Sequence, residues 1–143
     1  MSVGQKLAIV TAAGRGIGLA VARELHARGY RLALLSPSGS AAAVAREFGG
    51  IGHTGSVTKP NDLTALVADA ERAFGRIDAV VNNTGAAAHG ALLEISDQDW
   101  HAGVDMVFLN VVRMTRLVTP IMVAQGGGAI VNISTYAAFE PDP

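Results

Sequence analysis

Eight residues near the N-terminus combine glycines with a basic side chain in a pattern that can hold a phosphate group. The segment reads Thr11-Ala12-Ala13-Gly14-Arg15-Gly16-Ile17-Gly18 and lies between a short apolar run and a stretch with helical spacing. Glycines there let the backbone turn tightly, and the N–H groups at a helix N-terminus favour a pyrophosphate. The glycines alternate and do not match the G-x-G-x-x-G spacing, so a plain strand-to-helix turn stays open as the other interpretation.

Polar residues also follow the later apolar runs. Asn82-Asn83-Thr84-Gly85 comes after one run, and Ser134-Thr135 comes after the last one. In open α/β sheets the carboxyl ends of the strands bind ligands, so both segments are candidates for a site. A simple turn, or two hydroxyl groups at a strand end, is the alternative for each of them.

Cofactor choice is predicted from the end of the second apolar run. A carboxylate there would bind the ribose hydroxyls of NAD, but this chain has Ser36-Pro37-Ser38 and no acid. The planar fork of Arg15 suits a phosphate, although a solvated surface charge is an equally open reading of this residue. We therefore expect NADP in preference to NAD, with NAD possible.

Composition excludes several classes of protein. The chain has 143 residues, 50% of them hydrophobic, with 11 basic and 12 acidic side chains and a formal net charge of −1. This balance argues against nucleic-acid binding, and the absence of cysteine excludes a disulfide scaffold and a thiolate metal site. The four histidines lack metal-ligand spacing, so we expect no metal. No apolar run approaches the ~18 residues of a membrane span, and we expect a cytoplasmic protein.

Short apolar runs alternate with helical patterns along the whole chain. Strands are expected at 7–10, 32–35, 51–54, 78–82 and 129–133, and helices at 17–28, 40–48, 60–75 and from Ser96 to about 125. This alternation predicts one α/β domain over residues 1–143, a doubly wound parallel sheet in the order 3-2-1-4-5.

The last helix carries the most detailed expectations. Its start is predicted from Ser96 with Asp99 three residues on, a variant capping box. Pro120 should kink or shorten it. One apolar face is predicted from Trp100, Val104, Val107, Phe108, Val111 and Val112, with Leu109, Met114 and Leu117 off that face. Trp100 is expected in the core.

Four motifs in order resemble the short-chain dehydrogenase/reductase family. The family turn T-G-x-x-x-G-x-G corresponds to Thr11-Ala12 followed by Gly16-Ile17-Gly18, with Ala12 in place of the first glycine. The family's N-N-A-G corresponds to Asn82-Asn83-Thr84-Gly85. An Asn in the long helix corresponds to Asn110, and the strand that ends at the active-site serine corresponds to 130–135. The resemblance covers essentially the whole chain.

The resemblance implies an NAD(P)-dependent oxidoreductase that transfers a hydride between a nicotinamide cofactor and a carbonyl or alcohol substrate. Asn110 would hold a water in a proton relay, and Thr135 would bind the substrate carbonyl, with Ser134 as a less favoured substitute. From the residues alone, a helix residue bonded to a neighbouring carbonyl is the alternative for Asn110. Ser56-Val57 stands where the family has Asp-Val beside the adenine, so Val57 corresponds to the Val and Ser56 replaces the Asp. The implied cofactor-binding residues are Thr11, Ala13, Gly14, Arg15, Gly16, Ile17, Gly18, Ser36, Ser38, Val57, Asn83 and Gly85.

The family's Tyr-x-x-x-Lys pair does not occur in these residues. We therefore expect the cofactor-binding, N-terminal part of a reductase, catalytically silent by itself and self-associating as a homo-oligomer. Two alternatives remain at this point: a dinucleotide-binding module without catalysis, and another doubly wound nucleotide-binding enzyme such as a methyltransferase. Titration with NADPH, NADH and S-adenosylmethionine separates the readings.

Overall fold

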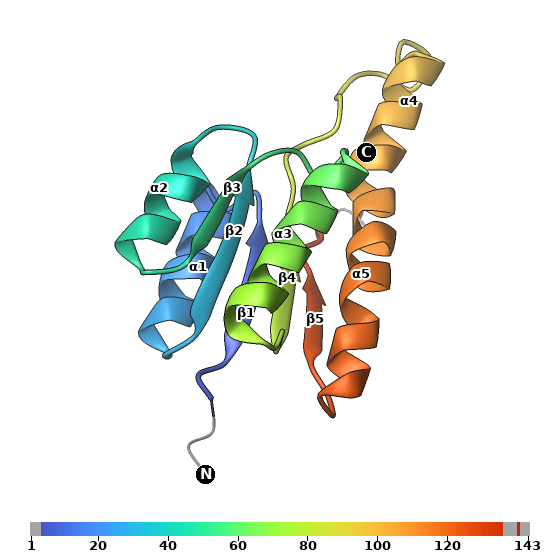
Figure 1. The fold of residues 1–143 in the computed structure, drawn as a ribbon. Helices are drawn as coiled ribbons and strands as arrows, with labels where there is room; N and C mark the ends of the chain where they lie inside the picture. Colours follow the sequence, from blue (N-terminus) through green and yellow to red (C-terminus); the bar gives the residue numbers. More distant parts are fainter. Residues whose placement is uncertain (1–3, 136–139, 141–143) are drawn as a thin grey trace.

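A computed structural model describes residues 4–135 and 140, and its centre is a parallel sheet of five strands (Figure 1). The strands are β1 (Leu7–Thr11), β2 (Arg31–Ser36), β3 (Ile51–Thr54), β4 (Ala79–Asn82) and β5 (Ala129–Asn132). Their order is β3-β2-β1-β4-β5, and every neighbouring pair is parallel. The predicted fold class and strand order are confirmed. The order reverses between β1 and β4, which places the expected ligand crevice at their carboxyl ends.

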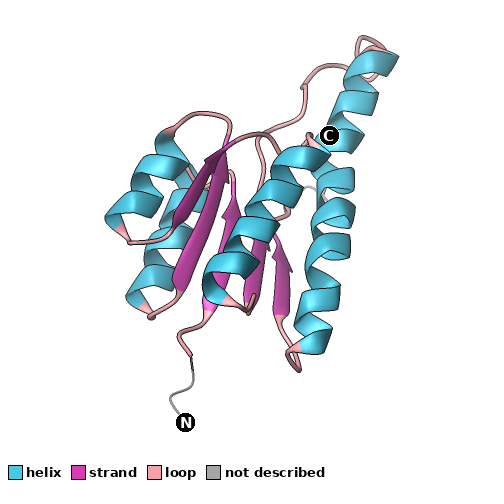
Figure 2. Cartoon of the chain, in the orientation of Figure 1, coloured by secondary structure: helices cyan, strands magenta, loops and turns pink. Residues whose placement is uncertain are grey.

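Helices cover both faces of this sheet (Figure 2). They are α1 (Gly16–Ala27), α2 (Ser40–Glu47), α3 (Pro60–Phe74), α4 (Asp97–Val104), a π-helical turn η1 (Asp105–Leu109) and α5 (Asn110–Ala124). Helices α1 and α2 pack on one face, and α3 and α5 pack on the other. Helix α4 extends past the carboxyl ends of the strands and has no buried residue.

The core has two halves because alternate residues of a strand point to opposite faces of the sheet. Leu7 and Ile9 of β1 pack with the residues of α3 and α5, whereas Ala8 and Val10 pack with those of α1 and α2. All five residues of β1 are buried. A strand covered on both faces needs a continuous apolar run, and this explains the pattern Leu-Ala-Ile-Val in the sequence.

The long helix differs from its prediction in which face it buries. Trp100, Val104, Val107 and Phe108 are 47–63% exposed, so the predicted core face was wrong. The buried stripe of α5 is Asn110, Met114, Val118 and Met122. This segment has two apolar stripes, and hydrophobicity alone does not say which of them meets the sheet.

The two ends of the long helix agree better with the sequence. The Ser96 hydroxyl accepts a hydrogen bond from the Asp99 backbone N–H at 3.2 Å and donates to the Asp99 carboxylate at 2.7 Å, so the predicted cap is present. Pro120 does not shorten α5, which continues to Ala124. The glycines 126–128 follow directly, as expected.

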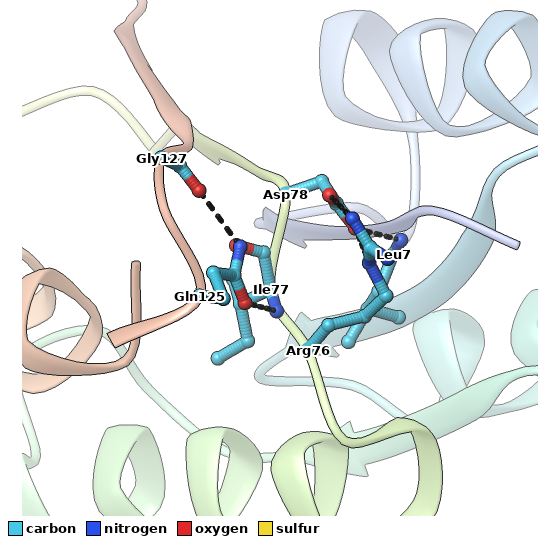
Figure 3. Close-up of polar contacts among 6 residues, drawn as sticks. All are labelled: Leu7, Arg76, Ile77, Asp78, Gln125 and Gly127. Atoms are coloured by element: carbon cyan, nitrogen blue, oxygen red, sulfur yellow. Dashed lines mark hydrogen bonds and ion pairs between the residues drawn. The ribbon is translucent and has the colours of Figure 1, made fainter. Parts of the chain in front are cut away.

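Side-chain hydrogen bonds tie β4 to its neighbours at the amino-terminal edge of the sheet (Figure 3). Gln125, after α5, accepts from the Ile77 N–H at 3.0 Å and donates to the Ile77 and Gly127 carbonyls at 2.7 and 2.8 Å. Asp78 accepts from the Leu7 N–H at 2.9 Å and pairs with Arg76. These contacts fix the start of β4 and leave the opposite edge of the sheet to the site.

Among the residues that the structure describes, one helical stretch, Asp97–Ala124, is long and apolar enough to cross a membrane by length and composition alone. This stretch differs from the expectation that no apolar run approaches the length of a membrane span. The core helix of a soluble protein passes the same test, and α5 buries Met114 and Val118 against the sheet. An 18-residue window of this stretch is 22% buried, and α5 is the part of it that packs on the sheet.

Candidate functional site

A cleft of about 710 Å³ lies at the carboxyl edge of the sheet, between the ends of β1, β2 and β4. Its lining residues come from the glycine turn, the end of β2, the turn after β3, the segment after β4 and the π-helical turn. They are Ala12, Gly14, Arg15, Gly16, Ile17, Leu35, Ser36, Pro37, Ser38, Ser40, Gly55, Ser56, Val57, Asn83, Thr84, Gly85, Ala86 and Met106. Sites of this size and position hold small organic ligands.

The floor of the cleft is the glycine turn, whose backbone takes a shape that few residues accept. Ala12 has φ +48° and Gly16 has φ +55°, so both lie in the left-handed region. Gly18 is buried, and a Cβ there would lie 2.4 Å from the Ala12 carbonyl oxygen and 2.8 Å from Asn83 Nδ2. The turn thus folds tightly back on α1, and only a glycine at position 18 allows this approach.

Helix α1 begins in this turn without a side-chain cap. Arg15 is its N-cap residue with φ −161°, and the Arg15 side chain makes no capping hydrogen bond. The first-turn N–H groups of a helix carry partial positive charge, and the side chain of Arg15 is exposed at the rim of the cleft. The arrangement suits an anion such as a pyrophosphate at the start of α1.

Three hydrogen bonds join the glycine turn to the segment after β4. The Thr11 hydroxyl donates to the Asn83 carbonyl at 2.7 Å and accepts from the Asn83 N–H at 3.0 Å. The Asn83 side chain also donates to the Ala12 carbonyl at 3.4 Å. Because Thr11 is buried and fully engaged, it positions both walls of the cleft and does not line it.

Hydroxyl groups dominate the cleft beside the end of β2. Ser36 donates to the Ser38 carbonyl at 2.6 Å and accepts from the Ala41 N–H at 3.1 Å. The Ser38 and Ser40 hydroxyls lie 2.6 Å apart. Gly14 leaves room for this cluster, since a Cβ there would lie 2.0 Å from Ser40 Oγ. With Arg15 on the same rim, this end of the cleft offers one cation and several donors, and no carboxylate.

The turn after β3 and η1 form a wall of the cleft that carries two apolar side chains beside Ser56. Val57 is 9% exposed and belongs to the core, yet it also lines the cleft. Met106 of η1 lies beside the segment after β4. A Cβ built on Gly85 would lie 3.9 Å from the Met106 sulfur, which is ordinary van der Waals contact. A flat apolar group such as a nucleotide base fits against side chains of this kind.

Asn110 is buried and bonded within its own helix. Its side-chain amide donates to the Met106 carbonyl, the arrangement that the sequence analysis kept as the alternative to a catalytic role. Its backbone N–H bonds to the Asp105 carbonyl, five residues back, because η1 is a π-helical turn and not an α-helical one. Asn110 therefore supports η1, and through it Met106.

Ser134 and Thr135 follow β5, which pairs with β4 through the register Asn82↔Asn132. Both residues are exposed and lie outside the lining of the cleft. The Ile133 N–H bonds to the Asn82 carbonyl at 2.9 Å, so the two hydroxyl residues begin beside the Asn83 end of the site.

Most of the predicted cofactor residues meet in the cleft: Gly14, Arg15, Gly16, Ile17, Ser36, Ser38, Val57, Asn83 and Gly85 line it. Thr11, Ala13 and Gly18 are buried behind them. Sequence reasoning missed Ser40 and Met106. Ser40 completes a Ser-x-Ser-x-Ser pattern that was available as a signal, whereas nothing in the sequence marks Met106, which depends on the π-helical turn.

The fold and the glycine turn define a doubly wound protein with a nucleotide-type crevice at its switch point. Residues 6–143 match the family described as short chain dehydrogenase, and the chain belongs to this family. It is 36% identical over 140 residues to the short-chain reductase protein NovJ of Streptomyces niveus, covering 94% of this chain and 53% of that protein. It is also 36% identical over 146 residues to dehydrogenase/reductase SDR family member 4 of Caenorhabditis elegans, covering 96% and 56%.

Two solved structures are similar in fold. L-sorbose reductase from Gluconobacter frateurii, complexed with NADPH and L-sorbose, gives a TM-score of 0.88 at 28% identity over 99% of this chain and 57% of that one. A 7α-hydroxysteroid dehydrogenase, complexed with NADH and 7-oxo glycochenodeoxycholic acid, gives 0.88 at 26% identity over 96% and 56%. The chain thus spans about half the length of the relatives it matches.

Proposed function

We propose that the cleft binds a nicotinamide dinucleotide. We also propose that the protein is an oxidoreductase that transfers a hydride between this cofactor and a carbonyl or alcohol. The observation that carries the proposal is the cleft itself: an uncapped helix N-terminus in a glycine turn is tied through Thr11 to Asn83. Family membership and the NADPH and NADH complexes of similar proteins support it. The bound cofactor would supply or accept the hydride.

We propose NADP as the preferred cofactor, with NAD as a weaker ligand. Arg15, Ser38 and Ser40 offer donors where an extra phosphate on the adenosine ribose would lie, and Ser36 takes the position of the acid that would repel it. The relatives include complexes with both cofactors, so the preference depends on these residues of the chain itself.

Fluorescence titration with NADPH and NADH tests both proposals. We expect tighter binding of NADPH, and Arg15→Ala should weaken it by about 1–3 kcal/mol, the scale of a charged hydrogen bond. Ser36→Asp should weaken the binding of NADPH more than the binding of NADH. S-adenosylmethionine is the control ligand. Equal affinity for the two cofactors contradicts the preference, and binding of S-adenosylmethionine alone contradicts the function.

We further propose that residues 1–143 by themselves bind the dinucleotide without turning over a substrate. Hydride transfer to a carbonyl needs a proton donor, and the family's Tyr-x-x-x-Lys pair is not present in this sequence. General acid catalysis alone contributes about 10²–10⁴ in rate. NADPH oxidation should be measured with a panel of ketones and aldehydes, for this chain and for a version extended to the length of its relatives. Equal turnover by both contradicts the proposal.

We also propose that the protein is cytoplasmic and that it self-associates, as expected from the sequence. Self-association is supported by the exposed apolar side chains of the long helix, including Trp100, Val107 and Phe108, around a hollow of about 310 Å³. Light scattering at increasing concentration tests it, and a monomer at all concentrations contradicts it.

A further inference from the structure

Arg113 lies outside the cleft but contacts two segments that form one of its walls. Its guanidinium donates to the Asp105 carboxylate and, at 3.5 Å, to the Thr58 carbonyl. Asp105 immediately precedes Met106, and Thr58 immediately follows Val57. Each anchor is thus one residue away from a side chain that lines the cleft.

We propose that Arg113 is a positioning residue that holds Val57 and Met106 at a fixed separation, so that the wall accepts the base of a nucleotide. This inference rests on the proposed dinucleotide binding. The resemblance to the family places the adenine beside Val57, and Met106 would contact it from the side of η1.

The two anchored segments have different internal support. The turn after β3 is bonded to itself, because Thr58 donates its N–H to the Ser56 hydroxyl at 3.2 Å and the Lys59 N–H bonds to the Ser56 carbonyl at 3.1 Å. Ser56 is further bonded through its N–H to the Asp62 carboxylate at 2.8 Å. This turn is a small rigid unit.

The η1 segment is a π-helical turn without a buried residue. It precedes α5 and follows α4, which lies away from the sheet and has no buried residue. Asn110 supports η1 from within the helix. Met106 itself packs against the core cluster that includes Val57. The contacts of Arg113 with Asp105 and Thr58 add a polar link between η1 and the turn after β3. Arg113 and Asp105 are 25% and 29% exposed, so water screens this pair less than a surface pair.

Arg116 provides a matched control for Arg113. It is the same residue type on the same helix, one turn further on, and it is exposed. Arg113→Ala should therefore reveal the positioning role, whereas Arg116→Ala should reveal only the general effect of removing an arginine from α5. Arg113→Gln keeps a donor and much of the side chain, and it serves if the alanine variant does not fold.

Calorimetric titration with 2′,5′-ADP tests the proposal, since this probe carries the base and the phosphates but no nicotinamide. We expect Arg113→Ala and Asp105→Ala each to weaken binding about fivefold or more, the scale of a partly buried ion pair. The double variant should be no weaker than either single one, because both remove the same link. Arg116→Ala should bind as the wild type does. Unchanged affinity in Arg113→Ala overturns the proposal, and so do additive losses.

Amide hydrogen exchange separates this inference from the proposed function. Without any ligand, Arg113→Ala should speed the exchange of amides 105–110 but not of those in β1 and β2, whereas Arg116→Ala should leave all of these amides unchanged. If the wild type binds no dinucleotide but these amides exchange faster in Arg113→Ala, the proposed dinucleotide binding is wrong and the positioning role of Arg113 is supported. If the amides do not respond, or the whole chain exchanges faster in both Arg113→Ala and Arg113→Gln, the positioning role is wrong.

Discussion

The side-chain amide of Asn110 donates a hydrogen bond to the carbonyl oxygen of Met106, one turn earlier in the same helix. In a regular α-helix this carbonyl would accept from the backbone N–H of residue 110. Here that N–H bonds to the Asp105 carbonyl, because η1 is π-helical. The side chain therefore satisfies the carbonyl that the wider turn leaves without its usual backbone donor.

Asn110→Leu should destabilise the fold by about 1–3 kcal/mol, because the leucine has a similar volume but leaves the Met106 carbonyl without its donor. Urea denaturation followed by circular dichroism measures the change in the free energy of unfolding. Asn61→Leu on the exposed surface of α3 is the control and should change it by less than about 0.5 kcal/mol. Equal stability of the two variants would show that the bond to Met106 does not support η1.

Ala12→Gly should stabilise the protein. A left-handed backbone costs an L-residue about 1–2 kcal/mol, whereas glycine adopts it freely but loses about 0.5–1 kcal/mol of chain entropy on folding. With φ +48° at Ala12, a net gain of up to about 1 kcal/mol is expected. Ala13→Gly, at a buried neighbour without positive φ, is the control and should destabilise. Thermal unfolding compares them, and a lower midpoint for Ala12→Gly would contradict the strained turn.

Two glycines of the same turn should respond differently to alanine. At Gly18 the new Cβ meets backbone, the Ala12 carbonyl at 2.4 Å, so Gly18→Ala should cost about 1–3 kcal/mol and weaken dinucleotide binding. At Gly14 it meets the end of a side chain, Ser40 Oγ at 2.0 Å, which can rotate away. Gly14→Ala should therefore be milder, and Ser40→Ala in the same chain should recover part of the lost stability, since Ser36 Oγ at 3.0 Å and Ser40 Cβ at 3.1 Å remain close. Calorimetric unfolding measures all three variants, and no recovery in the double variant would place the clash elsewhere.

The strands and the glycine turn were predictable because their causes are local. A continuous apolar run such as Leu7–Val10 indicates a strand buried on both faces, and the rule for parallel crossovers then limits the strand order. The site residues Arg15, Ser36, Asn83 and Gly85 follow from this order, since each stands at a carboxyl end or a helix start.

The long helix could not be predicted in detail because its burial is decided by the tertiary contacts. Trp100 and Phe108 are as apolar as the residues that pack on the sheet, yet they are 50% and 63% exposed, whereas Met114 is buried. The π-helical turn rotates the residues before Asn110 relative to those after it, and no residue type marks such a turn. Met106 lies within this turn and lines the cleft, so its place in the site was not predictable from the sequence.

Acid should weaken the fold through Asp78. Burial alone would raise the pKa of this carboxyl, but hydrogen bonds from Arg76 and the Leu7 N–H, with the charges of Arg76 and Lys6, lower it below the ordinary value. Because the pKa is lower in the folded than in the unfolded chain, the stabilisation is complete above the unfolded pKa of about 4 and is lost as the pH falls through the folded value. The carboxylate joins β1 to β4, so its protonation loosens the sheet at the edge opposite the site.

Asp78→Asn should therefore lower the free energy of unfolding at pH 7 by about 1–3 kcal/mol, the scale of hydrogen bonds to a charged group, and should flatten the decline of this free energy as the pH falls below about 4. Urea denaturation at several pH values measures both effects. Glu24→Gln, which removes an exposed ion pair with Arg28, is the control and should leave the curve almost unchanged. If the wild type and Asp78→Asn lose stability in parallel as the pH falls, another carboxyl carries the acid response, and the link between β1 and β4 does not depend on the charge of Asp78.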